Sequence, residues 1–138
     1  MLFITLNGRK RDVSIKPYLI DWERKVSGPQ KAVKDFLYPY WRHDTVLEEF
    51  RLPSARLRLD LLNINRLLII EVSPAQHQQY NPFFHRGSVA VFQQALKRDL
   101  AKEKFAQLNG FTFCELTTED LEEGLSPELF LTRFGITL

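Results

Sequence analysis

The run Leu67–Val72 (LLIIEV) is apolar at every position except Glu71. A continuous apolar run of this length is typical of a central strand that is covered on both faces of a sheet. Two earlier segments also predict strands: Val46–Leu52, which Pro53 follows, and Arg56–Leu62, in which polar and apolar residues alternate. These segments predict a sheet whose covering elements must come from the rest of the chain.

Helical segments are expected on either side of these strands. Ser27 can cap a helix that runs to about Trp41, and Ser88 can cap a longer helix that ends near Asn109. A further helix is expected over residues 17–25, because Pro is tolerated in a first helical turn. The chain therefore carries enough helix to cover a sheet.

The two ends of the chain add smaller elements. Residues 2–6 and 12–15 are β-prone and flank Asn7-Gly8, which predicts an N-terminal β-hairpin. Phe111–Leu116 predicts another strand, and two short helices are expected after it. This order predicts an α/β fold in which a mixed central β-sheet is flanked by helices and preceded by a hairpin extension.

Composition limits the broad class of protein. A chain of 138 residues with 44% hydrophobic residues is expected to form one domain with its own core. The 19 basic and 17 acidic residues give a net charge of +2, which does not by itself indicate a polyanionic partner. A single Cys, no apolar run near the length of a membrane helix and no signal-peptide pattern lead us to expect a cytoplasmic protein without a membrane partner.

Two carboxylates stand at the ends of neighbouring predicted strands. If the strands form a hairpin around Asn63-Ile64-Asn65, Asp60 and Glu71 lie near the same end of the sheet. Buried carboxylates need a cation or basic partners, so the pair is a candidate metal site. The alternative interpretation is that Asp60 pairs with Arg56 or Arg58 and that Glu71 is exposed.

Two more residues can complete such a site. His77 follows Glu71 by six residues and can act as a base or a ligand, or be an ordinary surface residue. Asp99 belongs to a helical face formed by positions 92, 96, 99, 103 and 106, or it caps or salt-bridges a neighbouring strand. Three carboxylates and one imidazole suit Mg²⁺ or Mn²⁺ better than zinc.

The motifs around these residues resemble a known family. They are RLDLLN (58–63), LIIEV (68–72), QH (76–77), NPFFH (81–85) and KRDLAKE (97–103). Together they are similar to the PD-(D/E)XK nuclease superfamily, and more narrowly to its Vsr-like branch of very-short-patch repair endonucleases and phage-encoded EDxHD homing endonucleases. The resemblance covers residues 27–116 and implies a restriction-endonuclease-like core, with residues 1–26 as an extension and residues 117–138 as a helical tail.

The resemblance implies a Mg²⁺- or Mn²⁺-dependent DNA endonuclease of a bacterial or phage-infected cell. It makes Asp60 and Glu71 the metal-binding carboxylates. Ser73 stands at the position of the superfamily Lys, which Lys102 or Lys104 can replace, and an amide occupies the position of the first-helix Glu. The implied catalytic residues are Asp60, Glu71, His77, Asp99, Gln30 and Lys102. A nuclease-fold module that binds DNA without cutting it, and a protein-interaction domain, are the alternatives.

DNA is the partner that a nuclease implies. Its contacts are expected from basic residues of the hairpin tip, the central strands and the long helix, each of which can also be an ordinary surface cation. One active site cuts one strand, so a double-strand break requires a homodimer or two encounters. The expected DNA contacts are Arg9, Lys10, Arg11, Arg56, Arg58, Arg86, Lys97 and Arg98.

Overall fold

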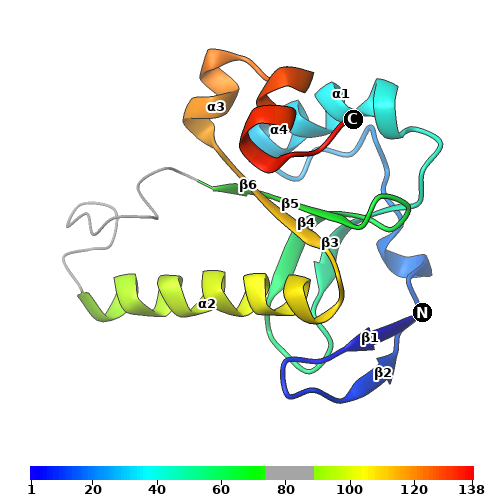
Figure 1. Cartoon of the computed structure of the whole chain (residues 1–138), viewed down its shortest axis with the longest axis vertical. Coiled ribbons are helices and arrows are strands. Elements are labelled where there is room, and N and C mark those ends of the chain that lie inside the picture. Colours follow the sequence, from blue (N-terminus) through cyan, green and yellow to red (C-terminus); the bar gives the residue numbers. More distant parts are fainter. Residues whose placement is uncertain (74–88) are drawn as a thin grey trace.

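The computed structural model describes residues 1–73 and 89–138 (Figure 1). Two short strands form a hairpin, and the remaining strands form one mixed sheet flanked by helices, so the expected mixed α/β class with an N-terminal hairpin is confirmed. In chain order the elements are β1 (Leu2–Ile4), β2 (Lys10–Asp12), the 3-10 helix η1 (Lys16–Tyr18), α1 (Gly28–Trp41), β3 (Val46–Arg51), β4 (Arg58–Asn63), β5 (Leu68–Ser73), α2 (Val89–Leu108), β6 (Thr112–Thr117), α3 (Thr118–Glu123) and α4 (Pro127–Phe134).

The main sheet has the strand order β3-β4-β5-β6. β4 is antiparallel to both β3 and β5, whereas β5 and β6 are parallel and are connected through α2. β5 is therefore an inner strand, and its residues Leu68–Ile70 are buried. This confirms the prediction that the apolar run is a central strand. The bounds of these four strands agree with the sequence-based expectations to within two residues.

Each face of the sheet carries its own apolar core. On one face, Phe105 of α2 and Phe3 of the hairpin pack with Leu62 and Ile69. On the other face, residues of α1 and α4 pack with Leu61, Ile70 and their neighbours. Figure 1 shows α2 on one side of the sheet and α1, α3 and α4 on the other. A strand buried on both faces must be apolar at successive positions, which explains the unbroken run in β5.

The start of α1 agrees with the sequence. The hydroxyl of Ser27 accepts a hydrogen bond from the backbone N–H of Gln30 (3.2 Å), which is a typical N-cap. Val33, Leu37 and Trp41 recur at four-residue spacing and are fully buried. The α1 prediction is confirmed at both ends.

The expected helix over residues 17–25 is wrong. Only the three-residue 3-10 helix η1 forms there. The backbone of the following residues bonds to distant parts of the chain: Ile20 donates to the carbonyl of Val46 (2.9 Å), and Asp21 donates to the carboxylate of Glu48 (2.7 Å). Tertiary partners therefore take the hydrogen bonds that a helix would have used internally.

The hairpin is attached to the core, and its second strand begins two residues earlier than the expected residues 12–15. Its strands cover residues 2–4 and 10–12, and Gly8 adopts a positive φ of 84° in the connecting loop. Phe3 is buried 5.1 Å from the ring of Phe50. Asn109, just beyond α2, accepts from the N–H of Ile4 (2.7 Å) and donates to its carbonyl (2.9 Å). The extension thus packs on the same face of the sheet as α2.

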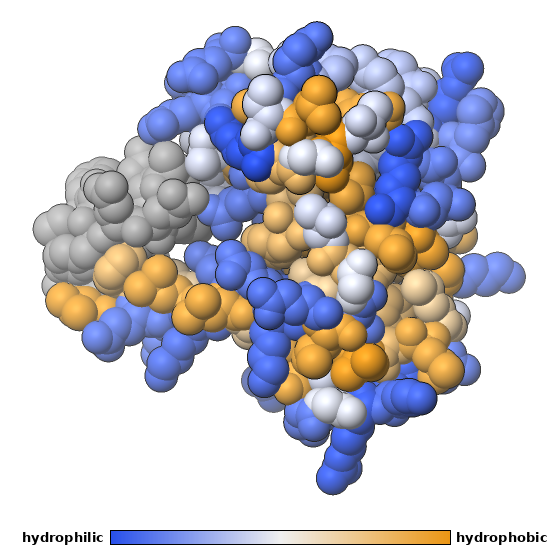
Figure 2. All heavy atoms as spheres, viewed as in Figure 1, coloured by the Kyte–Doolittle hydropathy of each residue, from blue (hydrophilic) through white to orange (hydrophobic). Residues whose placement is uncertain are grey.

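The long helix α2 buries little of its length. Figure 2 shows apolar residues along it, and Val89, Leu96 and Leu100 are exposed. The expected inner face is wrong at Leu96 and Glu103, which are exposed. The buried residues of α2 are Phe105 and Ala106, and positions 92, 95, 99, 101, 102 and 108 are partly buried. Ser88, the expected cap, lies outside the described residues. No helix in the described ranges is long and apolar enough to cross a membrane.

Candidate active site

The strands β4 and β5 pair from Leu61–Ile70 toward their hairpin turn. Beyond the Leu61–Ile70 pair, at Asp60 and Glu71, side-chain carboxylates accept the hydrogen bonds of the backbone N–H groups in place of backbone carbonyls. The N–H of Asp60 donates to Oε2 of Glu71 (2.6 Å), and the N–H of Val72 donates to Oδ2 of Asp60 (2.9 Å). The two carboxylates therefore lie side by side, as the predicted hairpin requires, and each is held by a backbone amide of the opposite strand.

The alternative interpretation of this pair is wrong. Glu71 is buried, with 6% of its surface exposed. The nearest cation on the same strand, Arg58, pairs with Glu49 of β3 instead of Asp60, at 3.8 Å. The charge that faces the pair comes from α2, where Nζ of Lys102 donates to Oε1 of Glu71 at 2.5 Å. Lys102 is thus in contact with Glu71, one of the two candidate metal-binding carboxylates.

Burial and neighbouring charges shift the pKa values of this cluster. Burial raises the pKa of Asp60, and burial together with the charge of Asp60 raises the pKa of Glu71 to about 8. Burial by itself lowers the pKa of Lys102, but the charges of Glu71, Asp60 and Asp99 outweigh this effect and raise it. Both carboxyl pKa values stay high although Lys102 is close, so further positive charge would stabilise the ionised pair.

A hollow of about 310 Å³ opens between this cluster and α2. It brings Asp99 to the same site as Asp60 and Glu71, as the sequence analysis expected. Glu115 also lines it, because Glu71 and Glu115 are register partners on parallel strands. The lining residues are Asp60, Glu71, Val72, Ser73, Val91, Ala95, Arg98, Asp99, Lys102, Phe113 and Glu115.

The sequence analysis missed two acidic residues near this hollow. Glu115 follows from alternation in residues 112–117 once that strand is paired in parallel with β5. Glu49 lies opposite Asp60 on β3, has a positive φ of 50° and raises the pKa of Asp60 through its charge. No local pattern marks Glu49, because its position depends on the pairing of β3 with β4.

Other expected site residues lie elsewhere. Gln30 is buried in α1 and does not line the hollow, and its Nε2 has no hydrogen-bond partner among the described residues. Ser73 does line the hollow, and its buried Oγ likewise has no partner within residues 1–73 and 89–138. His77 and Arg86 fall outside the described residues. In the described part of the chain, no group of three His, Cys, Asp or Glu side chains is arranged to hold a metal ion.

The expected DNA contacts divide into two regions. Arg98 lines the hollow, and Lys97 is exposed beside it on α2. Arg58 is exposed two residues before Asp60 on β4. The remaining described cations of this set are exposed on the hairpin and in the turn before β4; they are Arg9, Lys10, Arg11 and Arg56.

Comparison with family models, curated proteins and solved structures finds no match for this chain. The chemistry must therefore be argued from the site. One buried and one partly buried carboxylate, one ammonium and a neighbouring guanidinium can bind a hard cation and an anionic substrate group together.

Proposed function

We propose that this protein is a metal-dependent DNA endonuclease of the Vsr-like type, which hydrolyses internal phosphodiester bonds of DNA. The observation that carries the proposal is the cluster of Asp60, Glu71 and Lys102. A buried carboxylate, Glu71, beside the partly buried carboxylate of Asp60, with a single nearby ammonium, is costly in a purely structural role. We place this activity in the cytoplasm of a bacterial or phage-infected cell, as the family resemblance implies.

The residues present suit Mg²⁺ or Mn²⁺. Mg²⁺ is usually bound by one or two carboxylates, with waters and substrate phosphate oxygens as the other ligands, so a cage of three protein carboxylates is not needed. Asp60 and Glu71 would hold the ion, which supplies polarisation of the phosphate and an activated water. Glu71 already holds a cation, the Lys102 ammonium, through Oε1.

The other side chains of the hollow can bind and position the phosphodiester substrate. Lys102 has three N–H donors, of which one is used by Glu71, so the others can donate to a phosphate oxygen or orient the attacking water. Arg98 carries a planar guanidinium suited to a phosphodiester. Asp99 raises the pKa of Lys102 and so keeps that ammonium charged. His77 is proposed as the general base or as a leaving-group acid.

Cleavage of supercoiled and linear DNA by the purified chain with Mg²⁺ or Mn²⁺ tests the proposal. Asp60→Asn keeps an acceptor for the N–H of Val72 but removes the charge, and we expect at least about a hundred-fold loss of rate. Asp35→Asn is the matched control, because Asp35 is an exposed carboxylate of α1 that does not line the hollow. Absence of cleavage by the wild type, or full activity of Asp60→Asn, contradicts the proposal.

A DNA-binding module that does not cut is the second candidate. It is favoured by the ion pair of Lys102 with Glu71 and by the amide of Gln30 where the family has a carboxylate. Calorimetric titration with Mn²⁺ separates the two. If the protein is a nuclease, it binds Mn²⁺, and Asp60→Asn abolishes this binding. If it is a DNA-binding module, it binds DNA equally well with and without the metal. Gel filtration with and without DNA shows whether the protein forms the homodimer that is one of the two routes to a double-strand break.

A further inference from the structure

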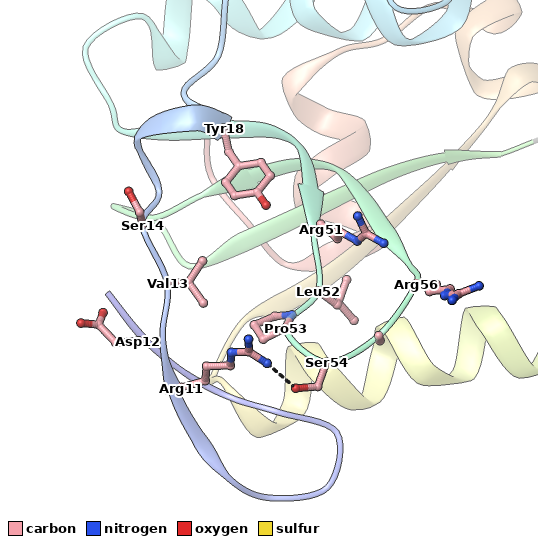
Figure 3. A pocket seen from close by; sticks show the side chains of 11 residues that line it. Arg11, Asp12, Val13, Ser14, Tyr18, Arg51, Leu52, Pro53, Ser54 and Arg56 are labelled. Atoms are coloured by element: carbon pink, nitrogen blue, oxygen red, sulfur yellow. Dashed lines mark hydrogen bonds between the residues drawn. The ribbon is translucent and has the colours of Figure 1, made fainter.

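A second hollow, of about 680 Å³, lies between the N-terminal hairpin and the turn that joins β3 to β4. Three arginines line it: Arg11 from β2, Arg51 at the end of β3 and Arg56 just before β4. Tyr18 and Ser54 also line it and contribute hydroxyl groups. Figure 3 shows Arg11, Tyr18 and Arg51 around the Leu52–Pro53 segment, while Arg56 points outward beyond the turn.

The walls of this hollow are held in place by interactions of their own. The turn is closed by the N–H of Leu52, which donates to the carbonyl of Leu57 (2.9 Å). Ser54 has a positive φ of 63°, and its hydroxyl accepts from the guanidinium of Arg11 at 2.9 Å. Tyr18 packs edge-on against Phe50, with ring centroids 5.0 Å apart. The arginines therefore extend from a framework that exists before any ligand binds.

The positive charge of the hollow is not neutralised within the protein. Among the described residues, no carboxylate forms an ion pair with Arg11, Arg51 or Arg56. Asp12, the acidic residue that lines the hollow, pairs with the N-terminal ammonium at 2.9 Å. Residues 74–88 contain no Asp or Glu. Guanidinium groups remain charged at all relevant pH values, so the cluster favours an external anion.

The size of the hollow indicates the kind of anion. A volume of about 680 Å³ could hold roughly twenty waters at about 30 Å³ each, which is much more than one phosphate occupies. Guanidinium groups bind phosphate oxygens in a bidentate manner, and hydroxyl groups add single hydrogen bonds. A stretch of sugar-phosphate backbone matches both the space and the donors.

We infer that this hollow, which we call the hairpin–turn site, binds a phosphate of the DNA backbone and fixes where the duplex lies relative to Asp60. The inference rests on the proposed function, because it names a second contact of the same substrate. Arg56 lies in the turn that leads into β4, the strand that carries Asp60, so the hairpin–turn site and the candidate metal-binding carboxylate are joined by one short stretch of chain.

The test measures DNA binding in EDTA, so that it does not depend on cleavage. Fluorescence anisotropy of a labelled duplex is followed over a range of salt concentrations for the wild type and for Arg11→Gln/Arg51→Gln. We expect about ten-fold or more weaker binding and a salt slope smaller by about two for the double variant. Lys25→Gln/Lys16→Gln removes two exposed cations that do not line the hollow, so it shows the effect of net charge alone.

A scan of neutral methylphosphonate linkages locates the contact. In the wild type, a methylphosphonate at one or two positions should weaken DNA binding. In the double variant, a methylphosphonate at the same positions should not change the affinity. Binding by the double variant equal to that of the lysine control overturns the inference. Thermal unfolding with inorganic phosphate distinguishes a site for free phosphate from a site for DNA. If phosphate raises the melting temperature of the wild type but not of the double variant, and both bind DNA equally well, the inference is overturned. Normal DNA binding without any cleavage contradicts only the proposed catalytic function.

Discussion

Lys34 and Glu48 form an ion pair in the interior of the protein. Nζ of Lys34 lies 2.6 Å from Oε1 of Glu48, and both side chains are almost fully buried. The ammonium also donates to the carbonyls of Asp21 (2.5 Å) and Arg24 (2.8 Å), so that all three of its N–H groups have acceptors. The pair therefore joins α1, β3 and the segment before α1. We expect Lys34→Met to destabilise the protein strongly.

The size of the effect follows from what remains around Glu48. After the change, its carboxylate retains the N–H of Asp21 at 2.7 Å and the guanidinium of Arg24 at 3.5 Å, whose side chain is 53% exposed. Breaking a buried pair from one side costs about 3–5 kcal/mol, and these remaining partners favour the lower end, about 3 kcal/mol. For a chain of this length, that loss lowers the melting temperature by roughly 10 °C.

Urea unfolding followed by tryptophan fluorescence measures this loss, and α1 provides a matched control. Lys31 forms a more exposed ion pair with Asp35 on the same helix, so Lys31→Met should cost at most about 1 kcal/mol. The double variant Lys34→Met/Glu48→Gln should recover much of the stability, because the amide oxygen still accepts from Asp21. The reasoning is refuted if Lys34→Met costs no more than Lys31→Met, or if the double variant is less stable than Lys34→Met.

Three further predictions concern the site and its supports. In the metal-free protein, the free energy of unfolding should fall as the pH rises from about 5 to about 8, because the folded protein holds the proton of Glu71 more tightly than the unfolded chain does; urea titrations should show this fall in the wild type and a much flatter profile in Glu71→Gln. Asn109→Ala should cost about 2 kcal/mol and speed amide exchange at Ile4, and unchanged exchange there would mean that Asn109 does not hold the hairpin. Cys114 is buried with its pKa raised to about 12, so a disulfide reagent should modify it roughly a hundred-fold more slowly in the folded protein than in urea, and equal rates would contradict its burial.

Patterns that depend on neighbouring residues were predicted well from the sequence. The apolar run at residues 67–72 is the inner strand β5, and the Ser27 cap marks the start of α1. Each of these signals involves residues within one turn or one strand of each other. Periodicity and capping are local, so a single sequence contains all the information that they need.

Interactions between distant residues were predicted less well. Residues 17–25 have a pattern compatible with a helix, but beyond η1 Glu48 and Lys34 bind the backbone there, and no helix forms. Glu115 was missed for a similar reason, because only the parallel pairing of β5 with β6 brings it level with Glu71. Such partners depend on strand order, which local patterns do not specify.

The candidate site shows both kinds of information. The hairpin turn in the sequence was sufficient to predict that Asp60 and Glu71 lie at the same end of the sheet. The contact of Lys102 with Glu71 spans 31 residues and requires α2 to lie across the sheet, so the family resemblance suggested Lys102 but local pattern did not. Similarly, the sequence analysis expected Arg11 as a DNA contact and did not single out Arg51, and the two share a hollow only because the hairpin docks beside the turn.

The sequence by itself determined the mixed α/β class, the central strand and the two carboxylates at its end. Those features follow from the alternation and burial of residues close together in the chain. Only the tertiary structure decided which charges surround the carboxylates and which arginines share a hollow. The physical reason is that electrostatic interactions depend on distance in space and on burial, and both are set by how helices and the hairpin pack on the sheet.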